Sequence, residues 1–148
     1  MKKLGANLTS SVPRASGSGE LRIELPAEPA SVTRIRQLVR EHAAGLELGA
    51  EQVFDLTTIV SEACGNVVRY AYDQDPGPVE VTLREDGDEL DLWVRDRGKG
   101  ICPRPEGDPQ GIGLGLALIG ALSKTFCLRS ELGSGTELGI RIPIRSTR

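Results

Sequence analysis

Six residues, Gly111-Ile112-Gly113-Leu114-Gly115-Leu116, decide how the chain is interpreted, because three glycines alternate there with apolar residues. The apolar run 117–122 that follows predicts a helix. Glycine lets a backbone approach a ligand closely. The first turn of a helix presents free N–H groups and the positive end of the helix dipole. The stretch therefore predicts an anion site, most often one for phosphate, but glycine-rich turns before helices are common and the rest of the chain must support it.

The composition is that of a single globular domain. The chain has 148 residues, 39% hydrophobic and 26% charged, which is enough to form a core. Its net charge of −3 argues against a non-specific nucleic-acid binder, which is usually basic. No apolar run follows Lys2 and Lys3, so we expect no signal peptide, no membrane span and no membrane partner. Three scattered cysteines give no disulfide framework, so we expect a cytoplasmic location, and with one histidine, His42, they give no pattern for a zinc site.

Hydrophobic periodicity predicts the element order β-α-α-β-β-α-β-β. Alternating residues predict strands near 21–25, 79–83, 90–94, 126–130 and 138–144, and helical spacing predicts helices near 31–44, 50–72 and 117–122. This order is not a regular βαβ repeat. It predicts an α+β fold, a two-layer sandwich in which helices cover one face of a mixed, mostly antiparallel sheet. Residues 1–19 predict a flexible tail, which leaves 20–145 as the domain. The proline-containing segment 101–110 predicts a lid.

The long helix predicted over 50–72 carries a polar face as well as an apolar one. Glu62 and Asn66 are four residues apart, so they are neighbours on the polar face. A helix face that simply meets solvent would look the same. The helix taken alone therefore leaves a site and a solvated surface equally open.

Four segments together resemble the GHKL ATPase superfamily. Glu62-Ala63-Cys64-Gly65-Asn66 resembles its N box, Asp96-x-Gly98-x-Gly100 its first glycine box, Gly111-x-Gly113-x-Gly115-Leu116 its second glycine box, and Gly135-Thr136 its final Gly-Thr pair. Each motif alone is weak, but the four in order are specific. The region from about 21 to 144 resembles the bacterial anti-sigma-factor serine kinases and their switch-kinase relatives, and Val68-Arg69-Tyr70-Ala71-Tyr72 supports this placement. The resemblance implies the Bergerat ATP-binding fold, with ATP and Mg²⁺ as cofactors.

The resemblance implies a role for each matched residue on the long helix and at the first glycine box. Glu62 would be the general base that takes a proton from an attacking hydroxyl. Asn66 would offer its side-chain oxygen to Mg²⁺, which prefers oxygen ligands. Asp96 would accept a hydrogen bond from the adenine amino group. Gly98 and Gly100 would let their loop run close under the base.

The second glycine box and the final Gly-Thr pair complete the implied site. Gly111, Gly113 and Gly115 would deliver backbone N–H groups to the phosphates, with Leu116 closing the motif. Thr136 would help to fix Asp96 and the adenine. Lys99 and Arg104 are further candidates for phosphate contact, although exposed charges seldom act so specifically.

Other nucleotide-binding motifs do not fit, and two departures from the family pattern matter. No G-x-x-x-x-G-K-[ST] sequence is present, and Leu116 stands where G-x-G-x-x-G requires glycine, which excludes a P-loop, a Rossmann fingerprint and a protein-kinase loop. Tyr70 stands where many of the resembled kinases have histidine. Gln110 stands where several of them have arginine. ATP binding is therefore better supported than catalysis.

The resemblance implies an ATP-dependent protein serine kinase of a partner-switching system. Its implied substrate is a STAS-domain anti-sigma-factor antagonist, and in the anti-sigma version it would also sequester a sigma factor. A homodimer without direct nucleic-acid contact is expected. One alternative is an ATP-binding regulatory module that switches protein partners without kinase turnover, and another is an ATPase module that works within a larger assembly.

Overall fold

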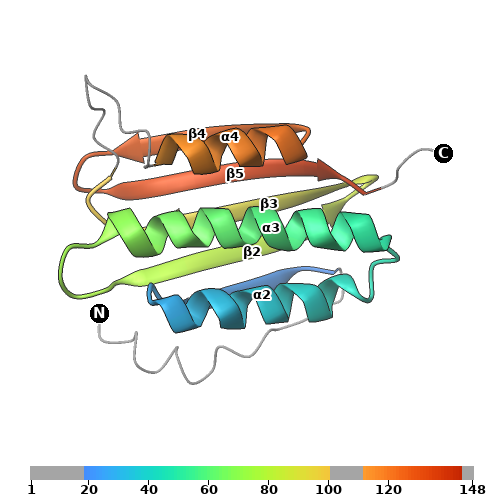
Figure 1. Cartoon of the computed structure of the whole chain (residues 1–148), viewed down its shortest axis with the longest axis horizontal. Helices are drawn as coiled ribbons and strands as arrows, with labels where there is room; N and C mark the ends of the chain where they lie inside the picture. Colours follow the sequence, from blue (N-terminus) through green and yellow to red (C-terminus); the bar gives the residue numbers. More distant parts are fainter. Residues whose placement is uncertain (1–18, 101–111, 145–148) are drawn as a thin grey trace.

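In the part of the chain that the structure describes, three α-helices all lie on one face of a five-stranded sheet (Figure 1). The computed structural model describes residues 19–100 and 112–144. Its elements are β1 (Leu21–Pro26), α2 (Pro29–Ala43), α3 (Ala50–Asn66), the π-helical η1 (Val67–Ala71), β2 (Pro78–Asp86), β3 (Glu89–Asp96), α4 (Ile112–Leu122), β4 (Thr125–Glu131) and β5 (Gly135–Pro143). The predicted element order and α+β class are confirmed.

The strands lie in the order β1-β2-β3-β5-β4. Every pair of neighbouring strands among the described residues is antiparallel, whereas the sequence predicts a mixed, mostly antiparallel sheet. The register places Asp96 at the end of β3 opposite Thr136 on β5, and Thr136 opposite Ser130 on β4. These three side chains therefore lie in one row, where β3 and β4 end, β5 begins and the Asp96 motif starts.

The core lies between α3 and the middle of the sheet. Alternate residues of β3, such as Leu92 and Val94, face the helices and are buried, because successive side chains of a strand point to opposite faces. Leu56, Ile59 and Val60 of α3 belong to the same buried cluster. Burying this apolar surface fixes the rotation of α3, so its other face, which carries Glu62 and Asn66, turns away from the centre of the core.

The face of the sheet away from the helices is covered by charged pairs. The Arg141 guanidinium holds the buried Asp91 carboxylate at 2.8 and 3.1 Å, and Arg95 pairs with Glu137 at 2.7 Å. The ring of Trp93 fills the space above Gly139, where a Cβ atom would lie only 2.4 Å from it. Ion pairs and one aromatic ring therefore cover this face.

Three predicted boundaries differ from the structure. The first helix begins at Pro29 rather than near Ser31, because proline at the first helical position has a preset φ and lacks an N–H that would be unpaired there. The long helix is α-helical only to Asn66 and continues as the π-helical η1. The third helix begins at Ile112 instead of residue 117, so it includes Gly113 and Gly115.

Two of the predicted segments lie outside the described residues, namely most of the tail at 1–19 and the lid at 101–110. His42, which the sequence gives no metal partner, has its Nε2 3.1 Å from the carbonyl oxygen of Gly19 and ties α2 to the residues before β1. Within the described ranges, no helix combines the length and apolar content needed to cross a bilayer.

Candidate functional site

Glu62 and Asn66 on α3 face the beginning of α4 at Gly115. A Cβ atom built on Gly115 would lie 3.1 Å from Oε1 of Glu62 and 3.3 Å from Nδ2 of Asn66. Gly115 is buried, whereas the two side chains are partly exposed. The structure therefore brings the predicted acid, the predicted metal ligand and part of the second glycine box together, and any larger residue at 115 would crowd the two side chains.

The second glycine box forms the first turn of α4. The first N–H groups of an α-helix have no partner inside the helix, and residues 112–114 supply such groups here. Gly113 thus contributes a free donor from inside the helix. Gly111 lies outside the described residues, and Leu116 packs against the hydrophobic core. The start of α4 provides the N–H donors that an anion requires.

Asp96 is held rigidly at the end of β3. Its Oδ1 accepts hydrogen bonds from the N–H of Gly98 at 2.8 Å and from the N–H of Thr136 at 3.3 Å. Only 8% of the residue is exposed. Burial raises the pKa of this carboxyl above its ordinary value, and the two N–H donors oppose that rise. The predicted link between Asp96 and Thr136 is a direct contact through the backbone of Thr136.

The two glycines after Asp96 are there because neighbouring backbone leaves no room for a side chain. A Cβ atom on Gly98 would lie 2.1 Å from the carbonyl oxygen of Ala71, and one on Gly100 would lie 2.5 Å from that of Glu131. Gly100 also has φ +84°, a conformation that favours glycine. We call residues 96–100 the Asp96 loop. It is clamped between η1 on one side and the β4–β5 turn on the other.

Backbone hydrogen bonds join the Asp96 loop to both neighbours. The N–H of Lys99 donates to the carbonyl of Ala71, and the carbonyl of Lys99 accepts from the N–H of Gly133, each at 2.9 Å. The Lys99 ammonium pairs with the Asp73 carboxylate at 2.8 Å, and its contact with phosphate stays a prediction. Arg104 and Gln110 lie outside the described residues.

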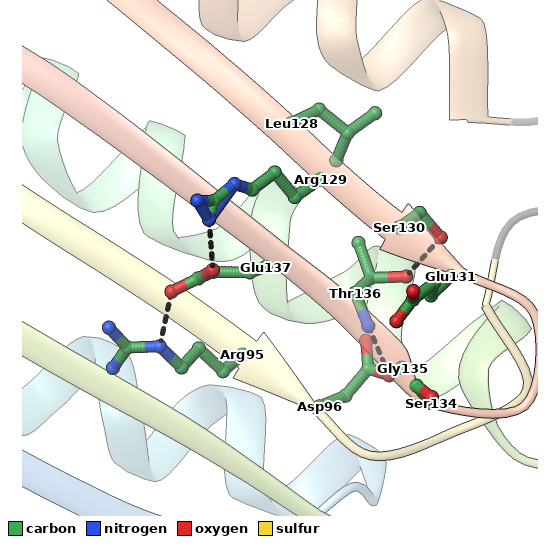
Figure 2. Close-up of a pocket in the computed structure, with 10 residues that line it drawn as sticks. All are labelled: Arg95, Asp96, Leu128, Arg129, Ser130, Glu131, Ser134, Gly135, Thr136 and Glu137. Atoms are coloured by element: carbon green, nitrogen blue, oxygen red, sulfur yellow. Dashed lines mark hydrogen bonds and ion pairs between the residues drawn. The ribbon is translucent and has the colours of Figure 1, made fainter.

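A groove with a volume of about 720 Å³ opens at this edge of the sheet (Figure 2). That volume is within the range of small-molecule sites. Asp96, Thr136 and Gly135 of the Gly-Thr pair line the groove, together with residues that sequence reasoning missed: Arg95, Leu128, Arg129, Ser130, Glu131, Ser134 and Glu137. Figure 2 shows the Glu137 carboxylate between Arg95 and Arg129, and the Thr136 hydroxyl beside that of Ser130.

Register explains why the sequence did not identify these lining residues. Alternation predicts two strands at the end of the chain, but it does not say which residue of β4 lies opposite which residue of β5. Ser130 becomes a groove residue only because it pairs with Thr136. Its hydroxyl oxygen is 3.1 Å from that of Thr136.

Two further residues of the site were not assigned a role by sequence reasoning. Arg69 donates a hydrogen bond from Nη2 to Oδ1 of Asn66 at 3.2 Å, and its guanidinium lies 5.7 Å from the ring centre of Tyr70. Tyr72 accepts a hydrogen bond from the backbone N–H of Arg97 at 2.9 Å. The motif Val68-Arg69-Tyr70-Ala71-Tyr72 was the signal for both, but helical periodicity could not say that η1 follows Asn66.

The residues around Asn66 fit an Mg²⁺ ion that arrives with a nucleotide. Among the described residues, no group of three or more His, Cys, Asp or Glu could hold a metal by itself. Asn66 offers a hard amide oxygen, and Glu62 stands beside it across from Gly115. Mg²⁺ commonly takes one or two protein oxygens and completes its octahedron with phosphates and water. This donor set suits that arrangement.

Comparison with known proteins identifies the family. Residues 25–142 match the family model of the histidine kinase-like ATPase domain. The chain is 28% identical over 122 residues to an anti-sigma F factor of Shouchella clausii, covering 74% of this chain and 80% of that protein. It is 34% identical over 79 residues to the serine-protein kinase RsbW of Bacillus velezensis, covering 53% of this chain and 49% of that protein.

A solved structure extends the match to three dimensions. The RsbU and RsbW domains of Rv1364c from Mycobacterium tuberculosis superpose with a TM-score of 0.69 at 25% identity, covering 87% of this chain and 34% of that chain. The matches therefore span most of the anti-sigma F factor, about half of the Bacillus kinase and about a third of the mycobacterial chain that holds the two domains. The matched region includes the N box, the first glycine box and the Gly-Thr pair. The predicted GHKL resemblance is confirmed, and the chain belongs to the family of histidine kinase-like ATPase domains.

Proposed function

We propose that this protein is an ATP-dependent protein serine kinase and anti-sigma regulatory factor of a partner-switching system. The observation that carries the proposal is the meeting of Glu62 and Asn66 with the first turn of α4 at Gly115. A carboxylate, an amide oxygen and free N–H donors converge there, which is what transfer of a phosphoryl group requires. The named functions of the anti-sigma F factor and of the Bacillus kinase support the proposal.

The proposed site has a base end and a phosphate end. Asp96 accepts a hydrogen bond from the adenine amino group, and Thr136 keeps the Asp96 carboxylate in place through its N–H. The N–H groups of Gly113 and Gly115 bind the phosphates, with Gly111 extending the same run. Gly98 and Gly100 keep the Asp96 loop flat against its neighbours, so that the base can lie over it.

Glu62 and Asn66 carry the chemistry in this proposal. Glu62 takes the proton of the attacking serine hydroxyl onto a carboxylate oxygen, while that hydroxyl oxygen forms its bond to the γ-phosphorus and the bond to the β–γ bridging oxygen breaks, releasing ADP. Asn66 holds Mg²⁺ through Oδ1. Bound Mg²⁺ neutralises charge on the phosphates. Because Gly115 has no side chain, Glu62 and Asn66 have room to lie against the first turn of α4.

The partners are proposed from the relatives and from the resemblance in the motifs. A STAS-domain anti-sigma-factor antagonist is the proposed substrate, and a sigma factor is the proposed second partner. The active form is proposed to be a cytoplasmic homodimer. The nucleotide state of the site would decide which partner is held, because only the ATP-bound state can lead to phosphotransfer.

A second candidate is a nucleotide-dependent binding module without kinase turnover. Two observations favour it. Tyr70 replaces a histidine found in many of the resembled kinases, and Arg69 occupies Oδ1 of Asn66, the atom proposed to hold the metal. Such a module would still bind ATP and would still change its protein affinity with the nucleotide.

Calorimetry followed by phosphotransfer separates the two candidates. Asn66→Ala should weaken Mg²⁺-dependent ATP binding by about 10-fold or more, because one contact to the ion is lost. Glu62→Gln should leave ATP binding within about 2-fold but lower phosphotransfer to purified STAS-domain proteins by roughly 100-fold or more. Asp55→Asn removes a carboxylate two turns earlier on the same helix and serves as the matched control.

The outcomes are distinct. Loss of phosphotransfer in Glu62→Gln with intact ATP binding supports the kinase. ATP binding by the wild type without transfer to any STAS-domain protein favours the binding module. Absence of Mg²⁺-dependent ATP binding in the wild type would sink both candidates.

A further inference from the structure

Tyr72 links the end of the N-box helix to the loop that carries Asp96. Its hydroxyl accepts a hydrogen bond from the backbone N–H of Arg97 at 2.9 Å and donates one to the carbonyl of Pro78 at 2.7 Å. Both partners are main-chain atoms. The hydroxyl therefore fixes the path of the backbone and does not depend on the identity of the side chains at 78 and 97.

The ring of Tyr72 is itself held in place. A Cβ atom on Gly77 would lie 2.5 Å from the ring, so glycine at that position lets the chain pass directly against it. Tyr72 is half-buried and packs against the hydrophobic core. A ring fixed by packing on one side presents its hydroxyl at a defined point, which is the requirement for orienting a loop.

Three consecutive N–H groups of the Asp96 loop are anchored by this arrangement. The N–H of Arg97 donates to the Tyr72 hydroxyl, that of Gly98 to the Asp96 carboxylate, and that of Lys99 to the carbonyl of Ala71. Tyr72 and Ala71 thus hold Arg97 and Lys99, which flank Gly98, whose N–H binds the Asp96 carboxylate. The orientation of Asp96 depends on both of them.

The π-helical turn η1 makes this reach possible. A π-helix accommodates more residues in a turn than an α-helix and is frequent at functional sites. Tyr72 follows it in an extended conformation, with φ −123° and ψ 143°. Tyr72 lies only six residues after Asn66, and its hydroxyl contacts the Asp96 loop. A short, hydrogen-bonded path therefore joins the two ends of the site.

We propose that Tyr72 is the positioning residue for adenine recognition, because its hydroxyl sets the angle at which Asp96 meets the base. This inference rests on the proposed function, in which Asp96 accepts the hydrogen bond of the adenine amino group. Tyr72 itself touches no substrate. It acts through the backbone of the Asp96 loop, and base selectivity is the property that it controls.

The test is Tyr72→Phe, which keeps the ring against Gly77 and removes only the hydroxyl. Affinities for Mg²⁺-ATP, Mg²⁺-GTP and Mg²⁺-tripolyphosphate are measured by calorimetry. We expect ATP affinity to fall about 5- to 10-fold, the loss typical of one or two hydrogen bonds, and the ATP-to-GTP ratio to fall with it. Affinity for tripolyphosphate should stay within about 2-fold, because the phosphate end is unchanged.

A control and a double variant make the assignment specific. Ser61→Ala removes a hydrogen bond of 2.8 Å, from the serine hydroxyl to the carbonyl of Thr57, within α3 and away from the Asp96 loop. It should leave the ATP-to-GTP ratio unchanged. Tyr72→Phe combined with Asp96→Asn should bind ATP no more weakly than Asp96→Asn alone, since Tyr72 acts through Asp96.

Each result has one meaning. Equal losses for ATP, GTP and tripolyphosphate would assign Tyr72 a purely structural role and overturn the inference. Given a wild type that binds ATP, an unchanged ratio of ATP affinity to GTP affinity in Tyr72→Phe would overturn it as well. Absence of ATP binding in the wild type would overturn the proposed function and this inference together. If Tyr72→Phe does not fold, hydrogen exchange on the wild type decides. Slower exchange of the Arg97 N–H on adding ATP supports the inference, and unchanged exchange overturns it.

Discussion

The side-chain oxygen of Asn66 accepts a hydrogen bond from the guanidinium of Arg69, with 3.2 Å between Oδ1 and Nη2. The same oxygen is the proposed ligand of Mg²⁺. Two cations cannot lie against one amide oxygen without strong repulsion. Entry of the metal therefore requires Arg69 to move away from Asn66.

Arg69→Gln should consequently lower the Mg²⁺ concentration that gives half-maximal ATP binding. A shift of about 2- to 5-fold is expected, because the competing hydrogen bond is partly exposed. The measurement is a Mg²⁺ titration at fixed ATP. Arg22→Gln, at an exposed arginine of β1 that pairs with Glu20, controls for the loss of one positive charge. An unchanged or raised Mg²⁺ requirement would contradict the proposed competition.

Gly98→Ala should disrupt the Asp96 loop. The new Cβ atom would lie 2.1 Å from the carbonyl oxygen of Ala71, a backbone atom that cannot swing aside. We expect ATP affinity to fall at least 10-fold and the thermal midpoint to drop. Gly87→Ala is the matched control. Gly87 has φ +66° but an open surrounding, so that change should cost only about 1–2 kcal/mol of stability and leave ATP affinity unaltered.

Asp96 should make the free energy of unfolding depend on pH. Burial raises its pKa in the folded protein above the unfolded value of about 3.9, so the folded state binds its proton more tightly. The contribution of Asp96 to stability is therefore fully present below about pH 3.9 and is lost as the pH rises through the folded pKa.

Urea unfolding of the wild type and of Asp96→Asn between pH 4 and pH 7 measures this effect. The stability of Asp96→Asn relative to the wild type should increase with pH and then level off. Asp75→Asn, at an exposed turn, controls for the loss of one negative charge. A stability difference that is flat with pH would show that the buried carboxylate ionises without cost. Asp96→Asn should also bind ATP more weakly than the wild type at pH 7. Together the two results would show that the carboxylate proposed to recognise the base lowers the free energy of unfolding at that pH.

The two cysteines of the described residues should differ sharply in reactivity. Cys64 is fully buried in α3, and burial raises the pKa of its thiol to about 12. Cys127 lies exposed on β4. The thiolate is the reactive form, so alkylation at pH 8 should modify Cys127 within minutes and Cys64 only in denaturant. Mass spectrometry of the peptides checks this, and modification of Cys64 in the native protein would show that α3 opens locally.

The sequence was sufficient to predict the element order and the placement of Glu62 and Asn66 on one face of α3. Both depend on local spacing, because apolar periodicity distinguishes helix from strand and residues four apart meet on a helix. The proline at position 29 was a usable signal for the true start of α2. The start of α4 was placed five residues late, because glycine has low helix propensity and the run 111–116 looks like a turn.

The contacts that complete the site could not be read from local spacing. Apolar periodicity does not separate a π-helical turn from an α-helical one, so Tyr72 was placed inside a helix instead of beyond its end. The meeting of Gly100 with Glu131 joins residues that are distant in the chain and depends on how β4 and β5 pair. Such contacts follow from packing and register.

The double clamp on the Asp96 loop has a consequence for protein synthesis. One side of the clamp, at Ala71, precedes the Asp96 loop in the chain, but the other requires Gly133 and Thr136, which are translated only after the loop. A nascent chain that lacks β5 has neither the second clamp nor the Thr136 donor to Asp96. A ligand that needs this loop would therefore stabilise only chains that include β5 and leave shorter products to proteolysis.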